Sequence, residues 1–597
     1  MAVDSAADPE LDPSVPPSDI APGEPLPQVE QDRAVLNAAR GRGRLARLGS
    51  FVRLSGPGWL QSAITLGGGS LSSSLYLGVI GGFGLLWLQP AAMVLGIIML
   101  AAIAYVTLST GRRPFEAMKS EINPALAWLW LIASMMANFV WCLPQYTLAE
   151  SALSQNLIGP GMPTIASVVL IFALAGVVSW FYESGGRGIK IFEALLKALV
   201  MLVVVSFMVV VGAMIWNGEI SIGFLVAGFI PDLGLVTGTG PEFKPLLRLI
   251  ETQPEYWESM IIGEQQSVMI SAFATAVGIN MTFLLPYSML ARGWDRDFRG
   301  LAIFDLSTSL LLPFLLATTC VVMAGAARFH AQPAGDLHTV AAPTELMAEQ
   351  KAAGDIAHKL TANYITLADG RLANLGVEPA GEDADGNPAY TDEQRAGLPI
   401  NDRRMAAALV KRDSGHLADA LTGVFGGYSD LIFGVGVFAM GISTIIILML
   451  INGFVFCEML GKPGDATTHR IGAFAAGAFG MLGPLLWNGP ASAYLAIPTS
   501  VFGAVLLPVA YLAFFAMMNS KSLLGDRRPT GTKRLLWNLA MGLSCTVATL
   551  TSLYAVWSAG GTKRTVGLVA VGLIIAAIAA THFMRTPRSE ETVESIA

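Results

Sequence analysis

The chain has 597 residues, of which 53% are hydrophobic and 14% are charged, and its formal net charge is −7. Soluble domains carry about 25% charged residues, so this composition excludes an ordinary soluble protein. Apolar blocks of about 20 residues, the length that crosses a bilayer as a helix, recur along the sequence. The composition therefore predicts an all-α polytopic membrane protein.

About twelve membrane-spanning helices are predicted. In chain order they cover residues 60–80, 85–109, 126–155, 163–181, 192–215, 264–290, 301–327, 431–456, 471–487, 495–518, 535–557 and 566–583. Basic residues follow the even-numbered blocks, such as Arg112 and Arg113 after the second and Arg527 and Arg528 after the tenth. Because basic residues concentrate in cytoplasmic loops, we expect both termini in the cytoplasm.

Insertions and tails divide the rest of the chain. Residues 1–50 are expected to form a disordered cytoplasmic tail that ends in a basic juxtamembrane segment, because their first part is rich in proline and acidic residues. The remaining units are helices 1–7 in 51–327 with an extracytoplasmic insertion at about 217–260, a second extracytoplasmic insertion at 328–430, helices 8–12 in 431–584, and a cytoplasmic tail at 585–597.

The first span contains Gly67, Gly68, Gly69 and Ser70 at its centre. Each glycine costs about 1 kcal/mol of helix propensity relative to alanine, and lipid cannot satisfy the backbone groups that a break exposes. Such breaks persist where the backbone lines a cavity, and in inverted-repeat transporters the substrate binds there. The sequence therefore predicts a broken helix and a substrate site at these four residues.

The sixth span carries a second interruption. Pro286 removes a helical hydrogen bond, and Gly278, Asn280 and Thr282 supply polar or permissive positions before it. The first and sixth spans occupy corresponding positions in two halves of five helices. Two such breaks together indicate a 5+5 inverted-repeat transporter.

Several segments resemble one transporter family in order and spacing: residues 55–78, 189–195, 433–458, and 507–508 with 519–521. The resemblance is to the natural resistance-associated macrophage protein (NRAMP) family of proton-coupled divalent-metal transporters, and it extends over about 50–560 apart from the insertions. It implies a LeuT-like fold, the fold of sodium-coupled amino-acid transporters. It also implies metal ion transport.

The departures from the family pattern fall on its chemistry. The family binds metal with an Asp-Pro-Gly-Asn motif in the first span, where residues 67–70 of this chain read Gly-Gly-Gly-Ser. Its sixth-span motif is Met-Pro-His, and Leu285, Pro286 and Tyr287 are aligned with it here. Its third-span acidic pair falls near Pro144 and Thr147. The chain thus resembles a divergent NRAMP-like member that lacks the metal-binding motifs, and no metal ligand is assigned.

Three substrate classes remain open. A hard cation such as magnesium, which keeps most of its water, needs only carbonyls and hydroxyls. A neutral or zwitterionic solute such as an amino acid could be held by the amides of Gly68, Gly69 and Ser70 and by Asn280, Thr282 and Tyr287. The third alternative is a transport-dead sensor.

Four acidic residues lie at or within the apolar blocks and are candidates for a gate or for coupling. Glu193 and Asp305 lie close to basic loops and are expected to form an intracellular gate or an ion pair. Glu150 lies deep in the third span as a candidate coupling group, and Glu264 is expected to begin the sixth span as an N-terminal acid.

The sequence contains no grouping typical of an enzyme, so a channel or receptor is the more serious alternative to a transporter. We expect no cofactor and no nucleic-acid partner, only a lipid bilayer and a small ion or solute. The expected location is a bacterial inner (plasma) membrane. The oligomeric state stays open.

Overall fold

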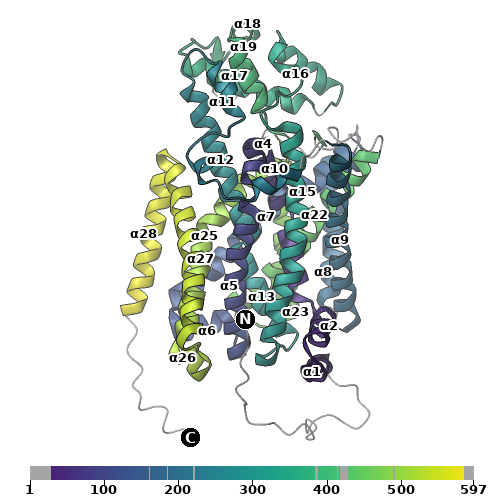
Figure 1. Ribbon diagram of the computed structural model, residues 1–597, viewed down its shortest axis with the longest axis vertical. Coiled ribbons are helices and arrows are strands. Elements are labelled where there is room, and N and C mark those ends of the chain that lie inside the picture. The colour runs from purple at the N-terminus through teal and green to yellow at the C-terminus, as the bar shows by residue number, and fades with distance from the viewer. Residues whose placement is uncertain are drawn as a thin grey trace.

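The computed structural model describes residues 28–159, 162–183, 186–218, 222–355, 357–382, 388–412, 415–416, 428–487 and 491–583. Long helices run side by side as a bundle, and a smaller group of helices lies over one end of it (Figure 1). We call this group, α16–α19 with the hairpin β1–β2, the cap. The opposite end carries α2, α6 and α26 and is called the basic end (Figure 1).

The first half of the bundle consists of α1 (Gln28–Arg40), α2 (Arg44–Leu54), α3 (Pro57–Thr65), α4 (Gly68–Gly81), α5 (Leu88–Thr110), α6 (Pro114–Ala117), α7 (Pro124–Ser151), α8 (Thr164–Glu183), α9 (Gly186–Trp216) and α10 (Ile222–Gly228). It continues with α12 (Glu255–Ala276), α13 (Ile279–Ala291), α14 (Arg299–Asp305) and α15 (Leu311–Phe329). The short α11 (Phe243–Arg248) lies above the bundle, beside the cap helices (Figure 1).

The cap contains α16 (Pro343–Ala352), α17 (Ala357–Asn374), β1 (Gly381–Glu382), β2 (Pro388–Ala389), α18 (Asp392–Ala396) and α19 (Ile400–Ala408). The second half of the bundle contains α22 (Ser429–Met459), α23 (Ala466–Gly480), α24 (Leu482–Leu486), the short helix η9 (Ala493–Leu495), α25 (Ala496–Asn519), α26 (Lys521–Leu524), α27 (Gly531–Ser558) and α28 (Gly561–Phe583).

Among the described residues, ten helical segments are long and apolar enough to cross a membrane. The bent pair α3 and α4, with 51° between its halves, makes an eleventh. The one expected span that is missing from this set is the ninth, at 471–487, which is α23 followed by the short α24. With 15 residues, α23 is about 22 Å long, which is less than the ~30 Å hydrocarbon core, although it packs closely on α22 and α7.

The N-terminal segment is folded from residue 28 onward, which corrects the expectation of disorder up to residue 50. In α1, Arg33 forms ion pairs with Asp295 at 2.8 Å and Asp297 at 2.6 Å, in the loop after α13. Leu36 of the same helix is buried. These contacts with distant residues hold α1 in place, and the composition of the segment does not reveal them. Residues 1–27 and 584–597 lie outside the described part.

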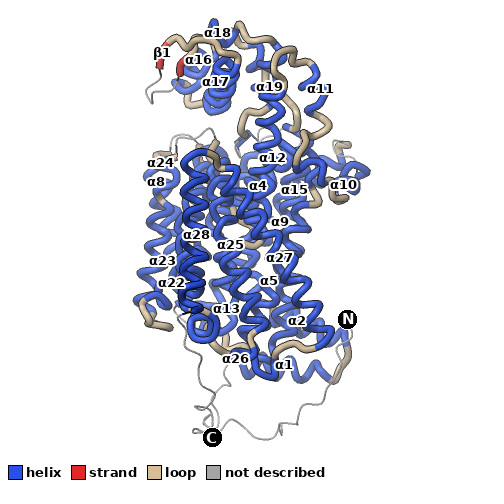
Figure 2. The backbone as a smooth tube through the Cα atoms, turned by 90° about the vertical axis from the view of Figure 1, so that its left-hand side faces the viewer, coloured by secondary structure: helices blue, strands red, loops and turns tan. Residues whose placement is uncertain are grey.

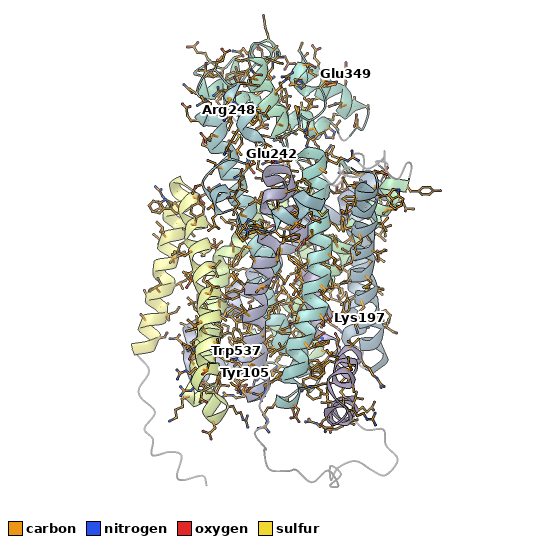
Figure 3. The ribbon with its side chains drawn as sticks, in the orientation of Figure 1. Tyr105, Lys197, Glu242, Arg248, Glu349 and Trp537 are labelled. Carbon is orange, nitrogen blue, oxygen red and sulfur yellow. The ribbon has the colours of Figure 1, made fainter. Side chains whose placement is uncertain are left out.

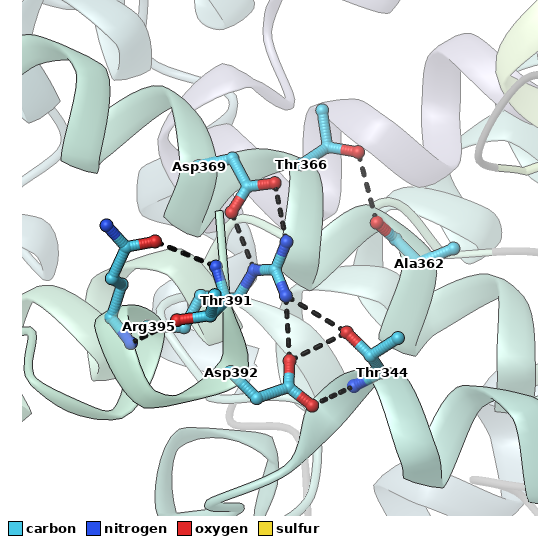
Figure 4. A network of polar contacts seen from close by, with 8 residues as sticks. Thr344, Ala362, Thr366, Asp369, Thr391, Asp392 and Arg395 are labelled. Carbon is cyan, nitrogen blue, oxygen red and sulfur yellow. Dashed lines mark hydrogen bonds and ion pairs between the residues drawn. The ribbon is translucent and has the colours of Figure 1, made fainter. Parts of the chain in front are cut away.

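The cap is held together by buried ion pairs. Arg395 binds Asp369 through two nitrogens, at 2.6 and 2.9 Å, and Asp392 at 2.7 Å (Figure 4). Arg371, which is fully buried, binds Asp402 at 2.7 Å. The expected insertion at 328–430 is therefore, where described, an ordered helical unit above the bundle (Figure 2).

Helix α12 connects the cap to the membrane region. Its first turns extend beyond the predicted start of the sixth span at residue 264, and Trp257 there is fully buried. The Trp257 indole donates a hydrogen bond to Asp402 at 2.7 Å. Any displacement of α12 must therefore move the cap or break this contact.

We expect Asp402→Ala to unfold the cap locally, because it leaves the buried Arg371 guanidinium without its carboxylate. Breaking a buried pair in this way costs about 3–5 kcal/mol. Amide hydrogen exchange in α17 and α19 should accelerate strongly. Glu349→Ala, at an exposed position of the same cap (Figure 3), is the control and should leave exchange unchanged. Equal protection in both variants would contradict the role assigned to this pair.

Candidate functional site

The break of the first span is real and lies between Thr65 and Gly68. Gly67 has an extended backbone, with φ −113° and ψ −174°. Hydroxyl groups satisfy the carbonyls that the last turn of α3 leaves free: Ser443 and Thr444 both donate to the Ala63 carbonyl at 3.2 Å, and Ser70 donates to the Thr65 carbonyl. The neighbouring α22 and the start of α4 therefore replace the helical hydrogen bonds that lipid could not supply.

All three glycines are closely packed, and a Cβ atom at Gly69 would lie 2.8 Å from the Thr275 methyl group. A Cβ atom at Gly67 would lie 2.1 Å from Thr444 Oγ1, and one at Gly68 would lie 2.8 Å from a Leu148 methyl group. The Gly68 amide donates to Gln145 Oε1 at 2.7 Å. This amide is therefore engaged within the protein, so it does not offer the free donor that was expected for a substrate carboxylate.

A small cavity lies beside this break and is called the central cavity. Its volume is about 10 Å³, roughly the space of one water molecule. It is lined by Ile64, Thr65, Gly69, Ser70, Trp141, Pro144, Gln145, Thr275, Thr444, Thr499 and Ser500. The described lining residues include hydroxyls and one side-chain amide but neither carboxylate, imidazole nor thiol. Across the described part of the chain, no three His, Cys, Asp or Glu side chains gather as a metal site.

The break of the sixth span lies at Val277 and Gly278, within the expected interruption but at its start and not at Pro286. Val277 (φ −142°, ψ 100°) and Gly278 (φ −81°, ψ 165°) are extended and separate α12 from α13. Pro286 lies inside α13 instead. A proline in a helix removes one hydrogen bond, and the surrounding turns of α13 continue without it.

The two breaks meet at Thr65. Its hydroxyl lies 3.4 Å from the Ala276 carbonyl and 3.2 Å from the Met281 sulfur. Met281 was not among the expected site residues, because the family's methionine was aligned with Leu285. The signal in the sequence that could have identified Met281 is its position three residues after Gly278. A thioether suits soft metals and is the one soft group found at this junction among the described residues.

Asn280 and Thr282 lie near the second break, as expected. The Asn280 side chain is fully buried, and its Nδ2 has no hydrogen-bond partner among the described residues. Leaving such a group unpaired costs about 1–3 kcal/mol, which marks a place for a water or a ligand oxygen. Thr282 instead accepts a hydrogen bond from the Trp130 indole at 3.0 Å.

Leu285, Pro286 and Tyr287 are not brought to the central cavity. Leu285 is buried in the apolar core, whereas Tyr287 lines a separate cavity of about 360 Å³ toward the basic end. The Tyr287 ring stacks on Phe283, with centroids 4.5 Å apart, and on Phe454 at 5.7 Å. This aromatic stack belongs to α13 and α22. Of the nine expected substrate residues, Gly69 and Ser70 line the central cavity directly.

Asp305 anchors the start of α3 instead of pairing with Arg299. Its Oδ2 accepts hydrogen bonds from the Gly56 amide at 3.2 Å and the Gly58 amide at 2.6 Å, and its Oδ1 accepts one from Ser309 at 2.8 Å. A carboxylate at a helix N-terminus satisfies unpaired amides and complements the helix dipole. Asp305, the last residue of α14, thereby links the start of the first broken span to that helix.

The other acidic candidates have different positions. Glu150 lies in the last turn of α7 and is not among the residues that line the central cavity. Glu193 belongs to α9, but its side chain lies outside the described part. Glu264 lies well inside α12, so the expectation that it begins the helix was wrong. It forms an ion pair with Lys411, whose nitrogen lies 2.5 Å from its Oε2.

We expect Gly67→Ala to destabilise the protein, because its Cβ must displace the Thr444 hydroxyl. Overpacking of this kind costs about 1–3 kcal/mol. Thr444→Ala removes the obstacle, so the double variant should be more stable than the sum of the two single effects predicts. A thermal-unfolding double-mutant cycle measures this coupling. Additivity within about 0.5 kcal/mol would contradict the close approach.

The chain has relatives among known proteins. A sequence model of the family described as "Natural resistance-associated macrophage protein-like" matches residues 58–363 and 405–558, more than half of the chain. Metal transporter Nramp3 of Arabidopsis thaliana is 30% identical over 174 residues, which are 29% of this chain and 33% of that protein. Metal transporter Nramp2 of Oryza sativa subsp. japonica is 28% identical over 178 residues, 29% of this chain and 33% of that protein. The chain thus covers about a third of the length of these relatives.

Solved structures support the fold. The Eremococcus coleocola manganese transporter, in complex with an aromatic bis-isothiourea substituted compound, superimposes with a TM-score of 0.60 at 14% identity, covering 90% of this chain and 95% of that one. A mutant of the same transporter gives a TM-score of 0.59 over the same shares. The expected LeuT-like architecture with broken first and sixth helices is confirmed. This integral membrane protein belongs to the natural resistance-associated macrophage protein-like family.

Proposed function

We propose that the protein is a secondary transporter of a hard divalent cation, such as magnesium, that meets oxygen ligands between the broken first and sixth spans. The observation that supports this proposal is the lining of the central cavity, whose side chains offer hydroxyl and amide oxygens without a carboxylate. Magnesium gives up water reluctantly and is bound through few protein contacts. A transition metal would need carboxylates or a fuller set of soft ligands than Met281 alone.

The engaged backbone supports a cation over a zwitterion. An amino acid would need free amides for its carboxylate, yet the Gly68 amide is bonded to Gln145. In this conformation the volume of about 10 Å³ is roughly the space of one water molecule, so an amino acid would need a larger expansion of the cavity than a small ion that keeps part of its water. The neutral-solute alternative therefore requires a larger rearrangement of the same residues.

We also propose that the basic end faces the cytoplasm, with both termini on that side, and that the membrane is a bacterial inner membrane. Arginines of α2 and of the segments next to α6 and α26 lie at this end, as the distribution of positive charge in membrane proteins predicts. The cap is then extracytoplasmic.

Reconstituted protein tests the substrate class. We expect liposomes that contain the protein to take up Mg²⁺ at millimolar external concentration and to take up neither Mn²⁺ at micromolar concentration nor amino acids above the level of empty liposomes. Stabilisation by Mg²⁺ in thermal unfolding without any flux would identify a sensor. Uptake of a labelled amino acid without Mg²⁺ uptake would establish the alternative.

Restoring a carboxylate should restore manganese binding. We expect Gly67→Asp combined with Thr444→Ala, which clears the space for the side chain, to bind Mn²⁺ at least tenfold more tightly than the parent, or about 1.4 kcal/mol. The matched control is Gly67→Asn with Thr444→Ala, which has the same shape without the charge. Calorimetry in detergent measures both. Equal affinities in the two variants would show that the break does not contact the cation.

A further inference from the structure

At the cap end, the insertion contacts the helices of the bundle through an ion pair and a cation–π contact. Lys411, just after α19, places its ammonium 2.5 Å from Glu264 Oε2 of α12. The same ammonium lies 4.4 Å from the ring centroid of Tyr494, and the Tyr494 hydroxyl donates to Glu264 at 3.1 Å. The Tyr494 ring also meets the Tyr76 ring edge-on, with centroids 5.3 Å apart. We call Tyr76, Glu264, Lys411 and Tyr494 the outer cluster.

Each transport helix in this cluster also leads to the central cavity. Helix α12 carries Glu264 and, eleven residues later, Thr275 of the cavity wall, about 16 Å further along the helix axis. Helix α4 carries Tyr76 and Ser70, and Tyr494 precedes α25, which carries Ser500. The outer cluster thus lies on the cap side of the central cavity, on elements that also carry or precede its lining residues.

The chain segment around Lys411 is fixed on both sides. The Lys411 amide donates to Asn363 Oδ1 of α17 at 2.7 Å. The following carbonyl, of Arg412, accepts a hydrogen bond from the Tyr76 hydroxyl at 2.6 Å, and the Arg412 guanidinium donates to the Gln332 carbonyl at 3.1 Å. The ammonium is therefore presented to Glu264 by an ordered backbone and not by a loose side chain.

We propose that Glu264 and the Tyr494 hydroxyl form an outer cation site, which the Lys411 ammonium occupies as a tethered competitor while the entrance at the cap end is closed. This inference rests on the proposed cation transport. An arriving divalent cation would bind the Glu264 carboxylate and displace the ammonium, which separates the insertion from α12 and α25. An oxygen pair of this kind suits a hard, partly hydrated cation.

The burial of the contact agrees with an exchange of one cation for another. The side chains of Lys411 and Glu264 are 14% and 27% exposed. Burial lowers the pKa of the Lys411 ammonium below its usual value, while the Glu264 carboxylate acts in the opposite direction. A buried charge of either sign needs its partner, so removal of the ammonium leaves a carboxylate that attracts a cation in its place.

Accessibility of the cavity tests the proposal without relying on transport. Ser500→Cys is introduced into full-length protein in lipid nanodiscs, and its rate of modification by a bulky charged maleimide is measured. We expect Lys411→Ala to raise this rate at least fivefold and Lys411→Arg to leave it within twofold of the parent. Lys359→Ala, which removes another contact from the cap to Ser492, controls for general loosening of the cap. An unchanged rate in Lys411→Ala would overturn the proposal.

Magnesium serves as the probe for the cation site. Addition of 10 mM Mg²⁺, about tenfold above the dissociation constant of roughly 1 mM that the weakest Ca²⁺ sites show, should raise the modification rate in the parent but not in Glu264→Gln. An equal rise in both would overturn the assignment of Glu264. If liposomes show no cation uptake yet modification still responds to Mg²⁺ through Glu264, the outer site stands and the proposed transport fails. If liposomes take up the cation but Lys411→Ala leaves the modification rate unchanged, the proposed transport stands and the outer site fails.

Discussion

The structure depends on how the broken first span obtains hydrogen bonds in a medium that offers none. Hydrocarbon leaves each free backbone group unpaired at a cost of several kcal/mol. Here the hydroxyls of Ser443 and Thr444 and the amide of Gln145 take over those bonds. Because these side chains must reach the backbone itself, Gly67 and Gly68 have no space for a Cβ atom. The break is therefore a packed junction of α3, α4, α7 and α22, and the small central cavity is what remains beside it.

The sequence alone was sufficient for the architecture. Hydropathy blocks, the basic loops and the run of glycines predicted the helices and the first break, and these follow from local composition. The second interruption was expected over a segment that includes Gly278 and Pro286, with proline as its strongest local signal. The helix breaks at Val277 and Gly278, at the start of that segment, where Gly278 packs against the Trp141 ring. A contact between distant helices decided this position, and neither helix propensity nor spacing carries that information.

Both halves of the first span are also fixed at their outer ends. At the basic end Asp305 accepts the amides of Gly56 and Gly58 at the start of α3, and the Lys197 ammonium reaches the Ser55 carbonyl at 3.3 Å (Figure 3). At the cap end the Tyr76 hydroxyl of α4 reaches the Arg412 carbonyl. None of these links could be foreseen, because the partners are 142 to 336 residues apart. With both ends of the first span held, the cavity beside its break is closed down to about 10 Å³.

A closed cavity of about 10 Å³ is too small for a cation that keeps its water. A hydroxyl that donates its hydrogen to a carbonyl, as Thr444 does to Ala63, keeps its oxygen lone pairs, but the oxygens around the cavity are neutral and Gln145 Oε1 already accepts from the Gly68 amide. A divalent ion without a carboxylate is costly to bury, and leaving it partly hydrated costs less but needs more room than the closed state has. If the protein carries the proposed cation, the ion must therefore bind when one end is released. We expect that release at the first and sixth spans, because their helices are already broken at Gly67 and at Val277 and Gly278.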